Sequence, residues 1–149
     1  MIEYRGPDGD DLHFVLSSWL QSYRLSSPCI NIPPHVYFKE QESKIKNLIV
    51  DSQLLIACNK LDPGQIFGWA CFQPDVFHYV YVKSTFRKNG IARELFRRSG
   101  MPTDKEFFYT HTPYIFYKNT YETEYRQGTF RAERLCKNGI YNPYLLERP

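Results

Sequence analysis

The sequence of 149 residues lacks the features that mark membrane, secreted and metal-binding proteins. No stretch approaches the roughly 18 uninterrupted apolar residues of a membrane span, and the N-terminus has no basic region followed by an apolar run. We therefore expect a cytoplasmic protein without a membrane partner. The four cysteines form no C-x-x-C pair, and together with the four histidines they show no spacing typical of metal ligands. These absences predict reduced, structural thiols and no bound metal.

The sequence also has little net charge, with 19 Lys and Arg against 16 Asp and Glu. Electrostatics alone therefore gives no support for a nucleic-acid partner, which stays possible only because aromatic residues lie among modest positive charge. Aromatic residues make up 17% of the chain, and disordered segments are poor in them. A chain of this length buries one sizeable core, so we expect a single domain over 1–149.

Periodicity along the chain predicts alternating helices and strands. Apolar residues at spacings of three and four predict helices over 12–23, 35–51 and 129–137, and a fourth that begins at Ile91 and ends before Gly100. Short aliphatic and aromatic runs predict strands over 2–5, 54–58, 65–72, 77–83 and 106–111, and an edge strand over 140–146 that contains Pro143. The polar turn 59–64 predicts a hairpin, whereas 113–127 supports no assignment. This order indicates an α/β (α+β) domain on one sheet.

The strand predicted over 77–83 reads FHYVYVK and is apolar on both faces, which is typical of a central strand. Strict alternation of side chains predicts two faces, one with His78, Val80 and Val82 and the other with Phe77, Tyr79 and Tyr81.

A basic loop with one glycine follows this strand and leads into the helix that begins at Ile91. Backbone amides at a helix N-terminus have no acceptor within the helix, and the macrodipole adds partial positive charge there. Gly90 allows a close approach of oxygen atoms, Ala92 keeps the turn uncrowded, and Arg87, Lys88 and Arg93 add full charges. The loop therefore predicts a diphosphate site. Neither GxxxxGK[ST] nor GxGxxG is present, which excludes a P-loop and the dinucleotide fingerprint.

The stretch 80–96, VYVKSTFRKNGIARELF, resembles the acyl-CoA-binding motif of the GNAT superfamily of N-acetyltransferases. That motif is a strand of form L-x-V followed by R/Q-x-x-G-x-G/A and a helix. Val80 and Val82 match the strand, and Arg87, Gly90 and Ala92 match the loop without a gap, while Ser84 replaces the usual proline. The resemblance is specific over 80–96 and architectural over 1–111. It implies a GNAT-like fold with a central mixed, mostly antiparallel sheet flanked by helices.

The resemblance also implies a ligand and an activity. The backbone of Val80 and Val82 would pair with the pantetheine arm of acetyl-CoA, and the loop would hold the pyrophosphate through Arg87, Lys88, Asn89, Gly90, Ile91, Ala92 and Arg93. The implied activity is direct transfer of an acetyl group from acetyl-CoA to a primary amine of a small molecule or a protein. A sheet edge left by the shortened C-terminal region leaves a homodimer open.

The base and the acid of the reaction match the family less well. The family's base is commonly a Glu on the fourth strand, where this chain offers Asp75 and His78. We favour His78, since an imidazole pKa near ~6.5 suits proton removal at neutral pH, with His111 as a second candidate. The alternative for both is a packed, hydrogen-bonded core histidine.

The family's acid is commonly a Tyr in the last helix, where the nearest match here has Leu135 or Cys136. Tyr117, Tyr121 or Tyr141 would then serve as the acid, or the thiolate would leave without one. The alternative function is a catalytically inactive, GNAT-like binding or interaction protein.

Overall fold

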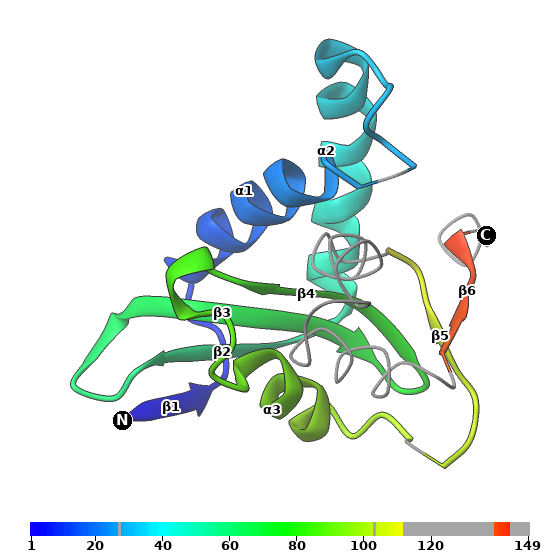
Figure 1. Ribbon diagram of the computed structural model, residues 1–149. Coiled ribbons are helices and arrows are strands. Elements are labelled where there is room, and N and C mark those ends of the chain that lie inside the picture. Colours follow the sequence, from blue (N-terminus) through cyan, green and yellow to red (C-terminus); the bar gives the residue numbers. More distant parts are fainter. Residues whose placement is uncertain (27, 103, 112–138, 144–149) are drawn as a thin grey trace.

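The computed structural model describes residues 1–26, 28–102, 104–111 and 139–143. The six strands found there form one sheet in the order β1-β2-β3-β4-β5-β6 (Figure 1). The strands are β1 (Ile2–Arg5), β2 (Gln53–Asn59), β3 (Asp62–Gln73), β4 (Val76–Val82), β5 (Phe107–Tyr109) and β6 (Gly139–Tyr141). The pairs from β1 to β4 are antiparallel, and β4–β5 and β5–β6 are parallel. The predicted α/β class and the mixed, mostly antiparallel sheet are thus confirmed.

Helices cover both sides of the sheet (Figure 1). The helices α1 (Asp11–Tyr23) and α2 (Pro34–Asp51) lie on one side, and α3 (Ile91–Arg98) lies on the other, preceded by the short 3-10 helix η1 (Ser84–Phe86). Their bounds confirm three of the predicted helices to within about one residue. The helix predicted over 129–137 lies outside the described residues. None of the described helices is long and apolar enough to cross a membrane.

Two clusters of buried side chains lie on opposite sides of the sheet. The cluster on the α1–α2 side consists of Val15, Trp19, Leu20, Tyr23, Cys29, Tyr37, Ile45, Leu54, Ile56, Cys58, Ile66, Trp69, Cys71 and Tyr79. The cluster on the α3 side consists of Ala57, Phe67, Ala70, Phe72, Phe77, Val80, Val82, Ile91, Leu95, Phe96, Met101 and Phe107. Cys29, Cys58 and Cys71 are buried and free, as predicted, while Cys136 lies outside the described residues.

The hairpin of β2 and β3 is tighter than the sequence predicts. Asn59 pairs with Asp62, so β3 already includes the segment that the sequence assigns to the turn. The physical reason is the side chain of Asn59, whose Oδ1 accepts a hydrogen bond from the amide of Leu61 at 2.9 Å and closes the turn in two residues.

The predicted alternation along β4 is wrong at one position. Cys71 pairs with Tyr79 and Phe72 pairs with Phe77, so His78 is an extra residue in β4, a β-bulge. Because the bulge shifts the alternation by one residue, Phe77 packs on the α3 side and Tyr79 on the α1–α2 side. The predicted common face of Phe77 and Tyr79 is therefore incorrect. Val80 and Val82 do share a face, as predicted.

Candidate functional site

The loop between β4 and α3 presents free backbone amides to solvent. The hydrogen bond from the amide of Glu94 to the carbonyl of Gly90, at 3.0 Å, is the first of the α3 ladder. The amides of residues 91–93 precede it and therefore have no acceptor within the helix. Gly90 has a φ of 77°, and no atom of the described residues lies within 4 Å of the position that its Cβ would take. The described part of the chain thus leaves room for a ligand beside Gly90.

Two residues of this loop have positive φ. Besides Gly90, Lys88 has a φ of 70°, a left-handed conformation that is uncommon for a residue with a side chain. Such strain costs on the order of 1 kcal/mol and is found most often at ligand-binding segments. The side-chain amide of Asn89 donates to the carbonyl of Phe86 at 3.3 Å and ties the loop to η1. The sequence-predicted residue Asn89 therefore supports the loop from within.

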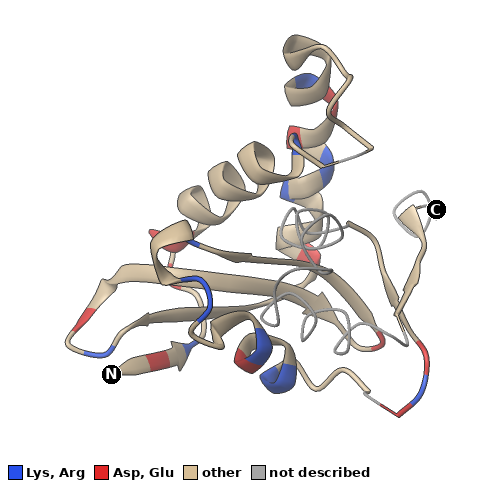
Figure 2. Cartoon of the chain, in the orientation of Figure 1, with Lys and Arg blue, Asp and Glu red and all other residues tan. Residues whose placement is uncertain are grey.

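Positive charge gathers at the start of α3 and on the loop before it (Figure 2). Arg97 and Arg98 are paired with Glu94 at 2.5 and 2.8 Å, and these hydrogen bonds hold the pKa of Glu94 at about 2. Lys88 and Arg93 are exposed, and neither has an ion-pair partner within the described ranges. Lys88 and Arg93 are thus available to an anion, whereas the charges of Arg97 and Arg98 are partly neutralised.

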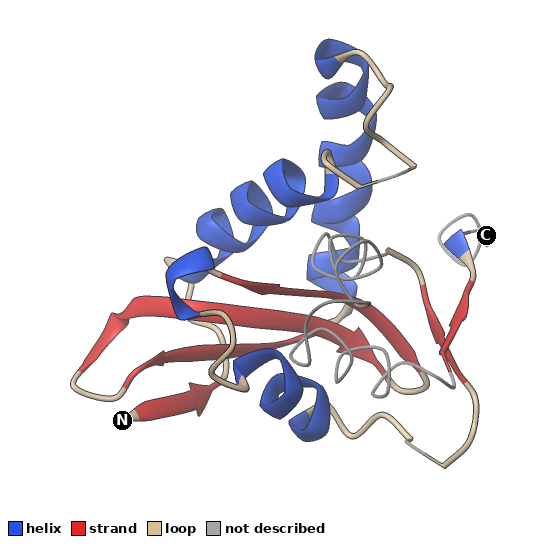
Figure 3. Ribbon diagram, in the orientation of Figure 1, coloured by secondary structure: helices blue, strands red, loops and turns tan. Residues whose placement is uncertain are grey.

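The strands β4 and β5 diverge after the first residues of β4, so the end of β4 that leads into this loop lies away from β5 (Figure 3). Their register pairs only Val76 and Phe77 of β4, and the amide of Thr110 donates to the carbonyl of Phe77 at 3.3 Å. The amide of Lys83 donates to Phe67 of β3, so strand alternation directs the backbone groups of Val80 and Val82 away from β3. Neither valine is paired with β5 in the part of the chain that the structure describes. Val80 and Val82 therefore present a strand edge to the gap between β4 and β5.

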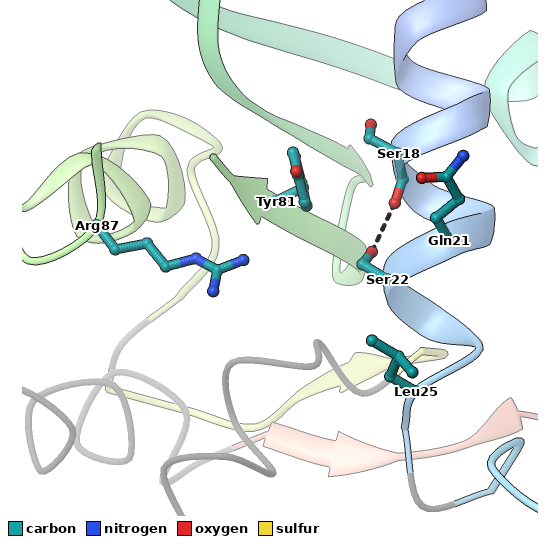
Figure 4. A pocket seen from close by; sticks show the side chains of 6 residues that line it. All are labelled: Ser18, Gln21, Ser22, Leu25, Tyr81 and Arg87. Carbon is teal, nitrogen blue, oxygen red and sulfur yellow. Dashed lines mark hydrogen bonds between the residues drawn. The ribbon is translucent and has the colours of Figure 1, made fainter. Parts of the chain in front are cut away.

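A cleft of about 190 Å³ lies between α1 and this strand edge (Figure 4). Its lining residues are Ser18, Gln21, Ser22, Leu25, Tyr81 and Arg87. Arg87 reaches across from the basic loop, and its Nε donates to the carbonyl of Val82 at 2.9 Å. The structure thus brings Arg87 to the strand edge, next to a position that the resemblance assigns to the pantetheine arm.

His78 and His111 meet where the two strands diverge. Nδ1 of His78 and Nδ1 of His111 lie 2.8 and 3.0 Å from the same atom, Oγ1 of Thr110. Nε2 of His78 lies 3.0 Å from Oε1 of Gln73. Thr110 and Gln73 are not among the sequence-predicted residues, because only the parallel pairing of β4 with β5 brings Thr110 to His78. The structure thus unites the two predicted histidines in one buried cluster.

Both histidines are nearly inaccessible, with 2% of each residue exposed. Burial lowers the pKa of His78 to about 4, and burial, reinforced by the charges of His78 and Lys44, lowers the pKa of His111 to about 3. The His111 ring contacts the rings of Trp19, Tyr23 and Tyr79 edge-on. Both imidazoles are therefore neutral at pH 7 and hold lone pairs that can accept a proton.

One of the candidate acids, Tyr141, is among the described residues. Its ring stacks on Tyr109 with centroids 5.5 Å apart, and its hydroxyl is hydrogen-bonded to Tyr23, which contacts His111. Tyr117, Tyr121, Leu135 and Cys136 lie outside the described residues. Tyr23 thus connects Tyr141 to the histidine cluster.

Comparison with known proteins finds similarity only at the level of structure. No protein-family model and no curated protein sequence matches the chain. The apo form of YjaB from Escherichia coli is 17% identical with a TM-score of 0.51, over 66% of this chain and 64% of that protein.

Two further solved structures align less closely. A GCN5-related N-acetyltransferase from Rhodopseudomonas palustris is 14% identical, with a TM-score of 0.48 over 65% of this chain and 62% of that one. A GNAT family acetyltransferase from Brucella melitensis in complex with acetyl-CoA is 15% identical, with a TM-score of 0.48 over 66% of each chain. The alignment thus spans less than two thirds of YjaB and of the Rhodopseudomonas palustris protein. The described residues share the fold of YjaB, and their mixed, mostly antiparallel sheet agrees with the fold that the resemblance implied.

Proposed function

We propose that this chain is an acetyl-CoA-dependent N-acetyltransferase that transfers the acetyl group directly to a primary amine of its acceptor. The observation that supports this function most strongly is the placement of two binding features side by side. The strand edge at Val80 and Val82 faces the gap between β4 and β5, and the same strand leads into the open amides at the start of α3. One extended ligand with amides at one end and a diphosphate at the other fits both features.

In this proposal the pantetheine amides pair with Val80 and Val82 as an added strand would. The pyrophosphate lies on the amides of residues 88–93, with Lys88 and Arg93 adding charge. Arg87 lies between the two parts, where its Nε donates to the carbonyl of Val82. Since a guanidinium has five N–H donors, Arg87 can keep this bond and still donate to the phosphates.

The chemical step requires a neutral amine held against the thioester carbonyl. The amine nitrogen bonds to the carbonyl carbon, the ammonium proton of the resulting intermediate passes to a base, and the C–S bond breaks as the thiolate leaves. We assign the base to the histidine pair, His78 and His111, because both carry lone pairs at the point where β4 and β5 diverge. The thiolate of coenzyme A then takes up one proton, and among the described residues the candidate donor is Tyr141.

A second candidate function is acyl-CoA binding without transfer. It is favoured by the low pKa of both histidines, since a base with a pKa of about 3 or 4 has little driving force for taking a proton. The two functions share the cofactor site and differ only in the chemical step.

The first test is titration calorimetry of the full chain with acetyl-CoA. Gly90→Glu places a negative side chain and a strained φ in front of the free amides, and we expect it to weaken binding by at least tenfold. Arg87→Glu reverses the charge beside the strand edge and should have a similar effect. Lys60→Glu, in the β2–β3 turn, alters the net charge by the same amount as Arg87→Glu and should leave binding unchanged.

Absence of binding to the parent chain would overturn both candidate functions. If acetyl-CoA binds, release of free thiol in the presence of a panel of primary amines distinguishes the two. Thiol release that depends on an amine supports transfer. Binding without any thiol release, across small amines and N-terminal peptides, supports the binding protein instead.

A further inference from the structure

Four polar side chains form a continuous hydrogen-bonded chain through the buried region between β4 and β5. The order is Gln73, His78, Thr110 and His111, with successive distances of 3.0, 2.8 and 3.0 Å. His78, Thr110 and His111 are each at most 2% exposed. Buried polar atoms in such a chain need defined donors and acceptors, so the direction of each bond can be deduced.

The direction is fixed at the Gln73 end. The side-chain nitrogen Nε2 of Gln73 lies 2.9 Å from the backbone carbonyl of Asp51, which can only accept a hydrogen bond. The amide group of Gln73 is therefore oriented with Oε1 toward His78. Because that oxygen can only accept, Nε2 of His78 carries the proton.

The remaining bonds follow from this assignment. A neutral His78 with its proton on Nε2 has a lone pair on Nδ1, so the hydroxyl of Thr110 donates to it. Thr110 has only one hydrogen, and Nδ1 of His111 must therefore donate to Oγ1 of Thr110. Neutral His111 thus has its lone pair on Nε2.

We propose that Thr110 couples His78 and His111 into one proton relay, so that a proton accepted at Nε2 of His111 becomes a positive charge on His78. The proton on Nδ1 of His111 moves to Oγ1 of Thr110, and the hydroxyl proton of Thr110 moves to Nδ1 of His78. Each group gains and loses one proton except His78, which becomes the imidazolium. This deepens the proposed function, because it rests on that function for the acetyl transfer that supplies the proton.

The surroundings favour charge on His78 over charge on His111. Rings of Trp19, Tyr23 and Tyr79 surround His111, and Lys44 of α2 adds an opposing positive charge. His78 instead keeps its Nε2 proton bonded to Gln73, whose side chain is only half-buried. Burial lowers the pKa of both histidines, and the charge of His78 lowers the pKa of His111 further. The pair holds one added proton at a time.

Thr110 is a positioning residue in this relay, since it acts through the histidines. Its place follows from the fold, because Thr110 directly follows β5 and its amide is bonded to Phe77, the residue before His78. The relay requires a hydroxyl at this position, because this group must donate one hydrogen bond and accept another at the same time. Valine has nearly the same shape but neither role, and serine has both.

The direct test is nitrogen NMR of the histidine rings in the full chain, labelled with ¹⁵N. In the parent we expect His78 to be protonated on Nε2 and His111 on Nδ1, and acidification to change the signals of both rings in one step. Thr110→Val should separate the two titrations and change the tautomer of His111, whereas Thr110→Ser should keep the parent pattern. Thr85→Val, in exposed η1, is the matched control and should leave both rings unchanged.

The same tautomer on both histidines in the parent would overturn the relay, as would a Thr110→Val variant that is folded and keeps the parent signals. If acetyl transfer is established, Thr110→Val should lower kcat by about ten- to a hundredfold and leave the KM for acetyl-CoA unchanged, with recovery in Thr110→Ser. A parent chain that binds no acetyl-CoA removes the proposed function but leaves the tautomer result standing, so the two failures are distinguishable.

Discussion

The two sides of the sheet bury different kinds of aromatic side chain. On the α3 side, every buried member of the cluster is a hydrocarbon or thioether side chain, and the ring of Phe96 contacts those of Phe77 and Phe107. On the α1–α2 side the largest rings are those of Trp and Tyr, whose polar atoms need partners. Trp69 Nε1 donates to the hydroxyl of Ser18 at 2.8 Å, for example, and the hydroxyl of Tyr37 donates to the carbonyl of Leu20 at 2.7 Å.

The two sides of the sheet therefore have different roles: packing on the α3 side stabilises the fold, and hydrogen bonds on the α1–α2 side orient side chains. Packing of hydrocarbon groups is non-directional, so the α3 side holds the helix and its basic loop against the sheet without restricting hydrogen-bond geometry. Hydrogen bonds on the α1–α2 side fix the rotation of rings. The hydroxyl of Tyr79, a ring that contacts His111, lies 2.7 Å from the hydroxyl of Ser22, which lines the cleft. The anion loop therefore depends on the α3 side, and the reactive groups depend on the polar network opposite.

The largest expected effect is on the α3 side. Leu95 is fully buried, and Leu95→Ala removes packing that nothing can replace, so we expect the free energy of unfolding to fall by about 2–5 kcal/mol. The loss should be the same at pH 7 and pH 5, because no group of this cluster titrates. Urea denaturation measures it. The matched control is exposed Arg93→Ala on the same helix, which should change stability by less than about 0.5 kcal/mol.

A smaller, pH-dependent effect is expected beside the α1–α2 cluster. The pKa values of His78 and His111 are lowered in the folded state to about 4 and about 3, so below pH ~6.5 the unfolded chain binds protons that the folded chain does not. Stability should therefore fall as the pH drops from about 6.5 to about 4, by on the order of 2 kcal/mol at pH 5 for each histidine that stays neutral.

Thermal melts between pH 7 and pH 4.5 measure this effect, and His111→Phe should reduce the slope. Hydrogen bonds from Arg5 lower the pKa of the Asp11 carboxyl group. The contribution of Asp11 to folding stability is therefore lost only below pH ~4, outside the range of these melts. A melting temperature that stays constant over the whole range would show that the histidines are not held neutral by burial.

Sequence periodicity predicted the elements well because their signals are local. The stripe of α1, the apolar run of β4 and the glycine of the α3 loop each depend on neighbours within a few residues. The β-bulge at His78 has no such signal, since neither a glycine nor a proline marks it, and the faces of Phe77 and Tyr79 were therefore assigned together. One inserted residue is invisible to periodicity until the partner strand is known.

In the candidate site, too, the sequence predicted what depends on neighbouring residues and missed what depends on strand pairing. The cofactor loop could be proposed from 80–96 alone because strand, loop and helix are contiguous. The histidine pair was proposed as two separate candidates, since only the parallel register of β4 with β5 brings them to the same hydroxyl. Gln73 and Thr110 contribute by orienting the histidines, and no spacing rule identifies a residue that acts through another.

The smallest expected effect tests whether the polar network on the α1–α2 side serves orientation more than stability. Tyr37→Phe removes the hydroxyl that donates to Leu20 at 2.7 Å, while the carbonyl of Leu20 keeps its bond from the amide of Arg24. We expect a loss of only about 1 kcal/mol in urea denaturation, because the hydroxyl exchanges this bond for one with water on unfolding. A loss as large as that of Leu95→Ala would mean that the network carries stability itself, and the contrast between the two sides would disappear.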